Sequence, residues 1–103
     1  MHVDGEVDLS NVKHVESRVF DALAADGQGV VLDLSGTRYL DSSGVSLLFT
    51  IAQRSQDQGR HLRVVVTDEA MIRRVILLTH LESRVPIDVD VDMALAALWA
   101  PGA

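Results

Sequence analysis

Apolar and polar residues alternate along this chain with two different periods. In some stretches an apolar side chain returns every three to four positions, which predicts an amphipathic helix, and in others apolar residues run together, which predicts a buried strand. The pattern predicts helices near 10–25, 43–58, 69–79 and 91–99, and strands near 30–34, 62–67 and 85–88. Because helices and strands alternate, we expect an α/β fold in which crossover helices join parallel strand pairs of a small mixed sheet.

Residues at the ends of these segments fit helix caps. Ser10 or Asn11 can cap the first predicted helix, and the pair Asp26-Gly27 can end it. Gly59 follows the second predicted helix, at a place where many helices end in a left-handed glycine. The chain has 103 residues and no internal repeat or linker, which indicates a single domain over residues 1–103.

Composition narrows the range of partners. With 15 acidic and nine basic residues the formal net charge is -6, so the chain repels nucleic-acid phosphates and anionic lipid surfaces. We therefore expect no direct nucleic-acid binding and no membrane association. No apolar run is long enough to span a bilayer, and the first residues lack the pattern of a signal peptide. The absence of cysteine excludes disulfides and suits a cytoplasmic protein.

The charged residues of the chain offer no metal or catalytic site that fits a known pattern. The spacing of Asp88, Asp90 and Asp92 resembles the start of a calcium-binding EF-hand loop. Met93 and Trp99, however, occupy the positions that such a loop fills with Gly and Glu, so we expect Asp90 or Asp92 to cap the last helix instead. The four histidines show no metal-ligand spacing, and we find no phosphate loop or nucleophile–base pair. The chain is therefore expected to have no metal site, no cofactor and no enzymatic activity.

The most informative segment is VVLDLSGTRYLDSSGVSLL, residues 30–48, in which a buried strand leads through a tight loop into a helix. Asp41 can accept hydrogen bonds from the first helical amides, which leaves Ser42 exposed beside the positive end of the helix dipole. A phosphoryl group there would add a charge of about −1.5 to −2, which a helix N-terminus tolerates. We expect Gly44 to leave the neighbouring surface bare for another protein. Taken alone, the four residues 41–44 also fit a simple capping turn.

This segment resembles the central signature of the STAS-domain anti-anti-sigma factors, also called anti-sigma factor antagonists. In that family an apolar strand ending in Asp-Leu leads to a helix that starts with Asp-Ser-Ser-Gly or Asp-Ser-Thr-Gly. Residues 5–8 are similar to the family's turn before the first helix, residues 72–79 to its third helix, and residues 91–98 to its closing helix. The resemblance covers about residues 5–99 and implies a STAS fold.

The resemblance implies a phospho-switch. In the family the serine directly after the Asp is the phosphoacceptor, which is Ser42 in this chain. A serine kinase that is also the anti-sigma factor phosphorylates it, and a PP2C-type phosphatase removes the phosphate. The unphosphorylated form binds the kinase and frees a sigma factor, whereas the phosphorylated form does not bind. The residues expected on the partner-binding surface are Asp8, Asp41, Ser42, Ser43 and Gly44.

Two features depart from the family pattern. Only four residues precede Gly5, so we expect the N-terminal strand to be missing or truncated. The sheet edge left open would then be covered by homodimer formation or by another segment of the chain. In addition, the third helix ends in Thr79-His80-Leu81, where the family has Thr-Gly-Leu. Because a left-handed cap is less favourable without glycine, we expect this helix to end differently.

A second interpretation is that the domain acts only as a scaffold or accessory. STAS domains of stressosome subunits, lipid-transport accessories and sulfate-transporter tails share the fold but often lack the serine, so the presence of Ser42 favours the switch. A third interpretation, an enzyme or nucleotide-binding domain, is disfavoured because phosphate loops and paired catalytic groups are missing.

Overall fold

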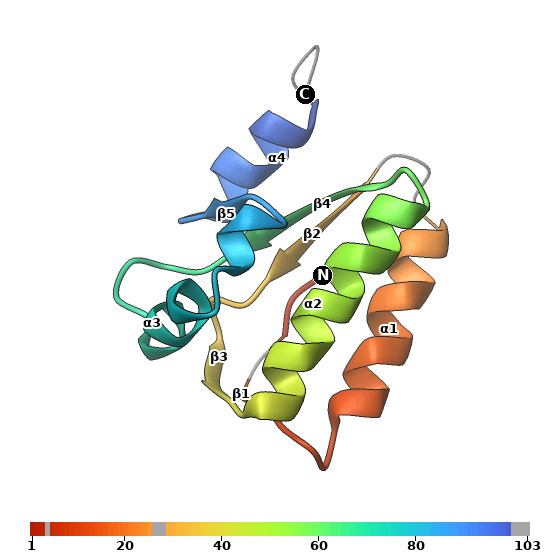
Figure 1. Cartoon of the computed structure of the whole chain (residues 1–103). Helices are drawn as coiled ribbons and strands as arrows, with labels where there is room; N and C mark the ends of the chain where they lie inside the picture. Colours follow the sequence, from red (N-terminus) through yellow and green to blue (C-terminus); the bar gives the residue numbers. More distant parts are fainter. Residues whose placement is uncertain (4, 26–28, 100–103) are drawn as a thin grey trace.

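The computed structural model describes residues 1–3, 5–25 and 29–99, and its elements follow the predicted order (Figure 1). The helices are α1 Val12–Ala25, α2 Ser42–Asp57, α3 Met71–Leu78, the short 3-10 helix η1 Leu81–Ser83, and α4 Val91–Trp99. The strands are β1 Gly5–Val7, β2 Gly29–Asp33, β3 Thr37–Leu40, β4 His61–Val65 and β5 Ile87–Asp88. The α/β fold class is confirmed, and each predicted helix and strand lies within two residues of its expected position.

The central sheet has the strand order β2-β4-β5, and both of its strand pairs are parallel. Successive strand residues point to opposite faces, so the apolar run of β2 serves two layers. Val30 and Leu32 join the main core with α1 and α2, whereas Val31 packs in a second cluster with Ala94 of α4. Figure 1 shows α1 and α2 side by side over the sheet, with α4 apart from them.

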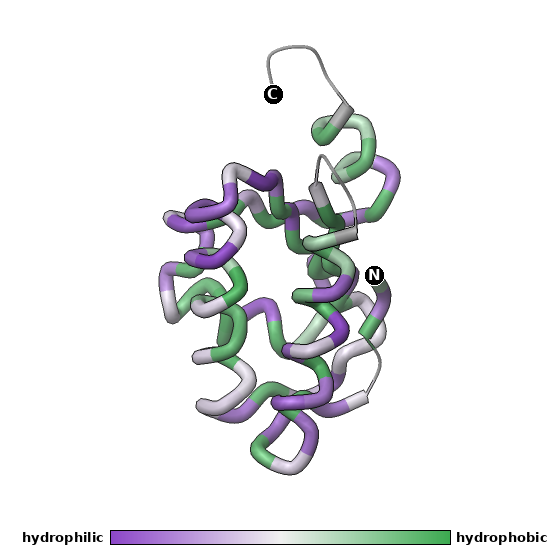
Figure 2. The backbone as a smooth tube through the Cα atoms, turned by 90° about the vertical axis from the view of Figure 1, so that its right-hand side faces the viewer, coloured by the Kyte–Doolittle hydropathy of each residue, from purple (hydrophilic) through white to green (hydrophobic). Residues whose placement is uncertain are grey.

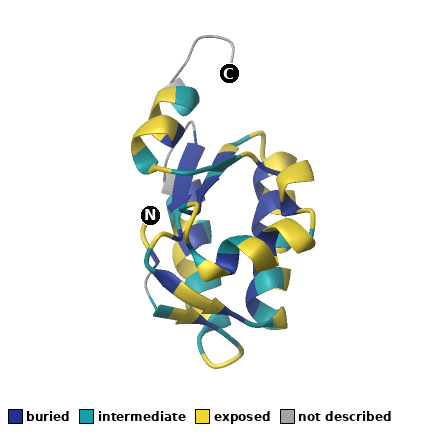
Figure 3. Ribbon diagram, turned by 90° about the vertical axis from the view of Figure 1, so that its left-hand side faces the viewer, coloured by how far each residue is buried: buried dark blue, intermediate teal, exposed yellow. Residues whose placement is uncertain are grey.

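Burial follows the amphipathic pattern of the helices. In Figure 3 the dark blue of buried residues covers most of the central strands and the inward turns of the helices, whereas yellow marks the outward turns and part of the β1–β3 pair. The hydropathy colours of Figure 2 alternate along the backbone in the same way. Val19 and Leu23 of α1 and Ile51 of α2 are almost completely buried, as helical spacing of the apolar residues predicts.

The pair of strands β1 and β3 was not predicted, and this corrects two expectations. Residues 5–7 were expected in a turn and residues 37–40 in a loop, but these segments pair in parallel as a second, two-stranded sheet. The strands are therefore divided between two small parallel sheets, where we expected one mixed sheet. The sequence TRYL conceals β3 because its outer residues Thr37 and Leu40 are buried while Arg38 and Tyr39 are exposed, which breaks the alternation typical of strands.

The first three residues lie beside the end of β2. The amino group of Met1 donates to the Val31 carbonyl oxygen (2.6 Å), and the backbone of Asp33 bonds to Met1 and Val3 on either side of an isolated bridge at His2. Part of this sheet edge is thus covered by a segment of the same chain, one of the two expected outcomes. Burial raises the pKa of the Asp33 carboxyl, but hydrogen bonds from Ser35 and the contact with His2 outweigh burial and lower that pKa.

A residue in the left-handed conformation follows each of the helices α2 and α3. Beyond α2 the Gly59 N–H donates to the Gln56 carbonyl oxygen and the Arg60 N–H to that of Ser55, and Gly59 has the left-handed φ of +67°. The predicted glycine end is confirmed. At the end of α3 the expectation was wrong: His80 itself adopts the left-handed conformation, with φ 61° and ψ 29°. The helix therefore ends as it would with glycine, although the residue is a histidine.

The other predicted helix ends give a mixed outcome. The Asp90 carboxylate accepts from the Met93 N–H (2.7 Å), which confirms it as the cap of α4. Asp88 pairs instead with the Arg63 guanidinium through two hydrogen bonds. The Asn11 carbonyl oxygen accepts from the Val15 N–H, so Asn11 stands at the cap position of α1, but its side chain bonds to Asp8 and Glu6 and does not cap the helix. The pair Asp26-Gly27 lies outside the described residues.

Within residues 1–3, 5–25 and 29–99 no helix is long and apolar enough to cross a membrane.

Candidate functional site

The start of α2 is held by Asp41. This residue has extended backbone angles, and its Oδ1 atom accepts a hydrogen bond from the Gly44 N–H at 3.0 Å. Its carbonyl oxygen accepts from the Val45 N–H, the first bond of the helix. The predicted cap is thereby confirmed, and Ser42 becomes the first residue of α2. A serine at that position lies beside the unpaired amides and the positive end of the helix dipole.

Asp41 also joins this helix start to the loop between β1 and α1. Its second oxygen, Oδ2, accepts from the Leu9 N–H at 3.1 Å, and its own N–H donates to the Val7 carbonyl oxygen at 3.3 Å. One carboxylate therefore satisfies amides from two segments about thirty residues apart in the chain, as its hydrogen-bonding capacity permits. The loop that contains Asp8 is fixed next to Ser42 by this link.

Asp8 organises the loop itself. Its Oδ1 atom accepts from the backbone N–H of Ser10 (2.9 Å) and from the Ser10 hydroxyl (2.5 Å). The Asn11 side chain accepts from the Asp8 N–H and donates to the Glu6 carbonyl oxygen, so it bridges to β1 and does not cap α1. Asp8 is partly exposed. Its role in partner binding stays a prediction, and the structure adds a role in shaping the loop.

Ser42 lines a shallow groove between the N-terminal parts of α1 and α2. The groove has a volume of about 310 Å³. Its hydroxyl-bearing residues come from α2, and its charged residues, Lys13 and Glu16, come from α1, where their side chains lie 4.0 Å apart. Ser42 is exposed and Ser43 is partly exposed. The lining residues are Val12, Lys13, Glu16, Ser42, Ser43, Ser46, Leu47 and Thr50.

Gly44 has a different role from the one expected. It is buried, so it does not provide bare surface beside the serine. A Cβ atom at this position would lie 2.7 Å from the Val7 carbonyl oxygen and 3.0 Å from the Leu40 side chain. Glycine is needed because the first turn of α2 packs directly against β1. Gly44 thus positions Ser42 from the inner side of the helix. Its burial does not support the predicted direct contact with a partner.

Sequence reasoning missed the neighbours of Ser42 that come from elsewhere in the chain. Lys13 of α1 and Leu9 of the loop are brought to the site by helix packing and by the Asp41 hydrogen bond. Neither residue belongs to a motif, and no local pattern distinguishes them. In the described part of the chain, no group of three or more His, Asp or Glu side chains is placed to hold a metal ion.

Comparison with known proteins identifies the family and the fold. The family model of the STAS domain matches residues 1–94. An anti-sigma factor antagonist from Mycobacterium paratuberculosis superposes with a TM-score of 0.84 at 28% sequence identity, with 96% of this chain and 83% of that chain covered. TM1081 of Thermotoga maritima superposes with a TM-score of 0.82 at 23% identity, covering 94% and 83%.

A third structure is more distant in sequence. The anti-sigma factor antagonist SpoIIAA in its unphosphorylated form has a TM-score of 0.66 at 16% identity, with 99% of this chain and 87% of that chain covered. At this identity, and at that of TM1081, the likeness concerns the fold alone. The match of the family model over nearly the whole length decides the assignment: this chain belongs to the STAS domain family.

Proposed function

We propose that this chain is an anti-sigma factor antagonist whose binding to a serine-kinase anti-sigma factor is controlled by phosphorylation of Ser42. In the unphosphorylated form it binds the kinase and so frees a sigma factor. A PP2C-type phosphatase returns the phosphorylated form to the binding state. The protein acts in the cytoplasm as a single domain, without cofactor or enzymatic activity of its own. The 28% identical neighbour, itself an anti-sigma factor antagonist, supports this role.

The observation that carries the proposal is the separation of two tasks between adjacent residues. Asp41 makes the hydrogen bonds that start α2, and no described residue hydrogen-bonds the exposed hydroxyl of Ser42. A kinase can therefore reach and modify this hydroxyl without removing a bond that stabilises the fold. A serine that capped the helix itself would be a poor switch, because its modification would cost stability.

The effect of phosphate follows from charge and space. The phosphoryl group would add about −1.5 to −2 charges next to the Asp41 carboxylate on a chain that already carries a formal net charge of -6. In a close interface, an added dianion must lose its water and meets whatever the partner places there. The result is a steric and electrostatic block to association.

The test uses purified protein, ATP and candidate serine-kinase anti-sigma factors, with mass spectrometry to map the phosphate. We expect phosphate on Ser42 of the wild type and of the control Ser46→Ala, an exposed serine of the same groove, and none on Ser42→Ala. Affinity for the kinase should be kept in Ser42→Ala and reduced in Ser42→Asp, with circular dichroism showing that each variant is folded. Phosphate on another residue would contradict the proposal. Equal binding by all variants would support the scaffold interpretation.

A further inference from the structure

A cavity lies beside the first residues of β4. β5 is only two residues long and pairs with Val64 and Val65, so the earlier residues of β4 have no neighbour in β5. The end of α2, the segment between η1 and β5, and the C-terminal part of α4 surround this stretch of β4, and the cavity between them has a volume of about 590 Å³. That volume lies within the range of about 300–1,000 Å³ that is typical of small-molecule sites.

The charged residues that line this cavity are basic. Arg60, Arg63 and Arg84, three of the nine basic residues of the chain, line it together with His61. None of the described residues in the lining is Asp or Glu, although acidic residues outnumber basic ones in the chain as a whole. The lining thus differs in charge from the rest of the chain. A cleft lined by one sign of charge concentrates ligands of the opposite sign, so an anion is the expected ligand.

The contacts of the arginines position them and still leave donors for a ligand, because a guanidinium has five N–H groups. Arg84 donates to the Gln53 side chain at 3.1 Å, and Arg63 donates twice to the Asp88 carboxylate, at 2.8 and 3.1 Å. Asp88 neutralises Arg63, whereas the Gln53 amide is neutral and orients Arg84 without cancelling its charge. Arginine suits phosphate in particular, since its planar fork binds two oxygens of the group at once.

Aliphatic side chains form another part of the lining. Leu62 of β4 and Val85 are buried, and Leu98 of α4 is partly buried. An aliphatic group on the anion would remove this apolar surface from water, which an inorganic anion would not do. Apolar walls with a few polar groups that fix the orientation of the ligand are typical of sites for small organic molecules.

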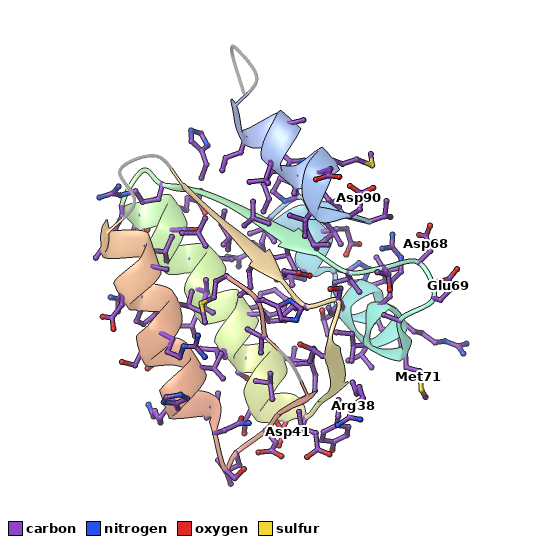
Figure 4. All side chains as sticks on the ribbon, turned by 180° about the vertical axis from the view of Figure 1, so that it is seen from behind. Arg38, Asp41, Asp68, Glu69, Met71 and Asp90 are labelled. Atoms are coloured by element: carbon purple, nitrogen blue, oxygen red, sulfur yellow. The ribbon has the colours of Figure 1, made fainter. Side chains whose placement is uncertain are left out.

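We infer that this cavity binds a soluble phosphate monoester with a short aliphatic body, at a site separate from Ser42. Ser42 starts α2, and Gln56 in the lining of the cavity lies near its end, about 20 Å away at the helical rise per residue. Figure 4 shows Asp41, which precedes α2, near one end of the molecule and Asp90, at the start of α4, toward the other. The inference therefore does not depend on the proposed function.

The test titrates n-butyl phosphate into the isotope-labelled protein and follows the backbone amide signals by two-dimensional NMR. We expect saturable binding at one site, with the signal changes centred on residues 60–63 and 83–86. The double variant Arg60→Gln with Arg84→Gln should bind at least about tenfold more weakly, because it loses charge-assisted hydrogen bonds to the phosphate. The matched control is Arg74→Gln, at an exposed arginine of α3, and it should change affinity less than about twofold. Circular dichroism should show all variants folded.

Other ligands identify which part of the probe is recognised. Butanol, butyrate and inorganic phosphate should each bind more weakly than butyl phosphate, because each lacks the phosphate or the aliphatic body. Equal binding by any of them would contradict the proposed ligand class. Vesicles that contain phosphatidic acid should not sediment the protein, and sedimentation would show that the phosphate belongs to a lipid surface.

The location of the site is tested separately. Ser42→Ala should bind butyl phosphate as the wild type does, and a loss of binding in this variant would place the probe at the start of α2, contrary to the inference. Binding without saturation, or equal binding by the wild type and the double arginine variant, would overturn it as well. Each of these results leaves the phospho-switch at Ser42 untouched.

Discussion

Helices α2 and α3 follow local rules to different degrees. α2 has an aspartate cap with a side-chain hydrogen bond at its start and a left-handed glycine beyond its end. α3 has Ala70 at its N-cap position, which makes no side-chain cap bond, and the left-handed His80 follows its C-cap residue Thr79. The exposed face of α2 is largely polar, with Ser42, Ser46 and Thr50, whereas α3 exposes the stripe of Met71, Val75 and Leu78.

The start of α2 is thus held by well-satisfied local interactions, whereas α3 presents apolar side chains to solvent. Where local rules are satisfied, as at the start of α2, a functional side chain such as Ser42 is held in place by residues other than itself. Where these local rules are violated without a gain in stability, as along α3, the unusual residues are better explained by a function than by the stability of the fold. The comparison predicts that substitutions of Asp41 and Gly44, which hold the start of α2, reduce the stability of the fold, and that substitutions of the exposed residues on α3 or of His80 leave it unchanged or improve it.

The largest expected effect comes from Gly44→Ala. The added Cβ would lie 2.7 Å from the Val7 carbonyl oxygen, which belongs to backbone and cannot easily move away. We expect the free energy of unfolding, measured by urea titration, to fall by about 1–3 kcal/mol. Met71→Ala at the start of α3 is the control and should change it by less than about 0.5 kcal/mol, because Met71 is exposed. Similar losses in both variants would contradict the comparison.

A smaller effect is expected for Asp41→Ala. This change removes the cap of α2 and the hydrogen bond to the Leu9 N–H together, so unfolding should require about 1–2 kcal/mol less. Asp90→Ala removes a cap bond of the same kind from α4, where the Asp90 side chain accepts from Met93. Its cost should be about 1 kcal/mol or less. If thermal or urea unfolding shows the two losses to be equal, the link between the loop and α2 contributes nothing.

How far the sequence predicts the fold depends on how local each signal is. The helices and the strands β2 and β4 were found because their apolar periods are determined by residues close together in the chain. β1 and β3 were missed because each is short and is defined by its pairing with a partner about thirty residues away. The end of α3 was judged wrongly because His80 adopts a backbone conformation that local preference disfavours.

The candidate site shows the same division. Asp41 as the cap and Ser42 as the exposed first residue of α2 follow from helix chemistry, and the structure agrees. The burial of Gly44 against Val7 could not be foreseen, because it depends on how closely β1 approaches α2. The exposed apolar residues of α3, Met71, Val75 and Leu78, were visible in the sequence, but apolar residue types alone do not distinguish a residue in the core from one that faces solvent on another side of the same helix.

The smallest expected effect is a gain in stability from His80→Gly. A left-handed conformation costs a residue with a Cβ about 1–2 kcal/mol, and the greater entropy of unfolded glycine cancels about 0.5–1 kcal/mol of the relief. The His80 contact with Glu82, at 3.8 Å between exposed side chains, contributes little. We therefore expect urea titration to show about 0.5–1 kcal/mol of added stability. The matched control is Gly59→Ala at the end of α2, where an added Cβ meets no atom within 4 Å, so only its left-handed φ opposes the change. That variant should be less stable by about 1 kcal/mol, and a loss of stability in His80→Gly would mean that the histidine side chain holds the end of α3 in a way its exposed position does not suggest.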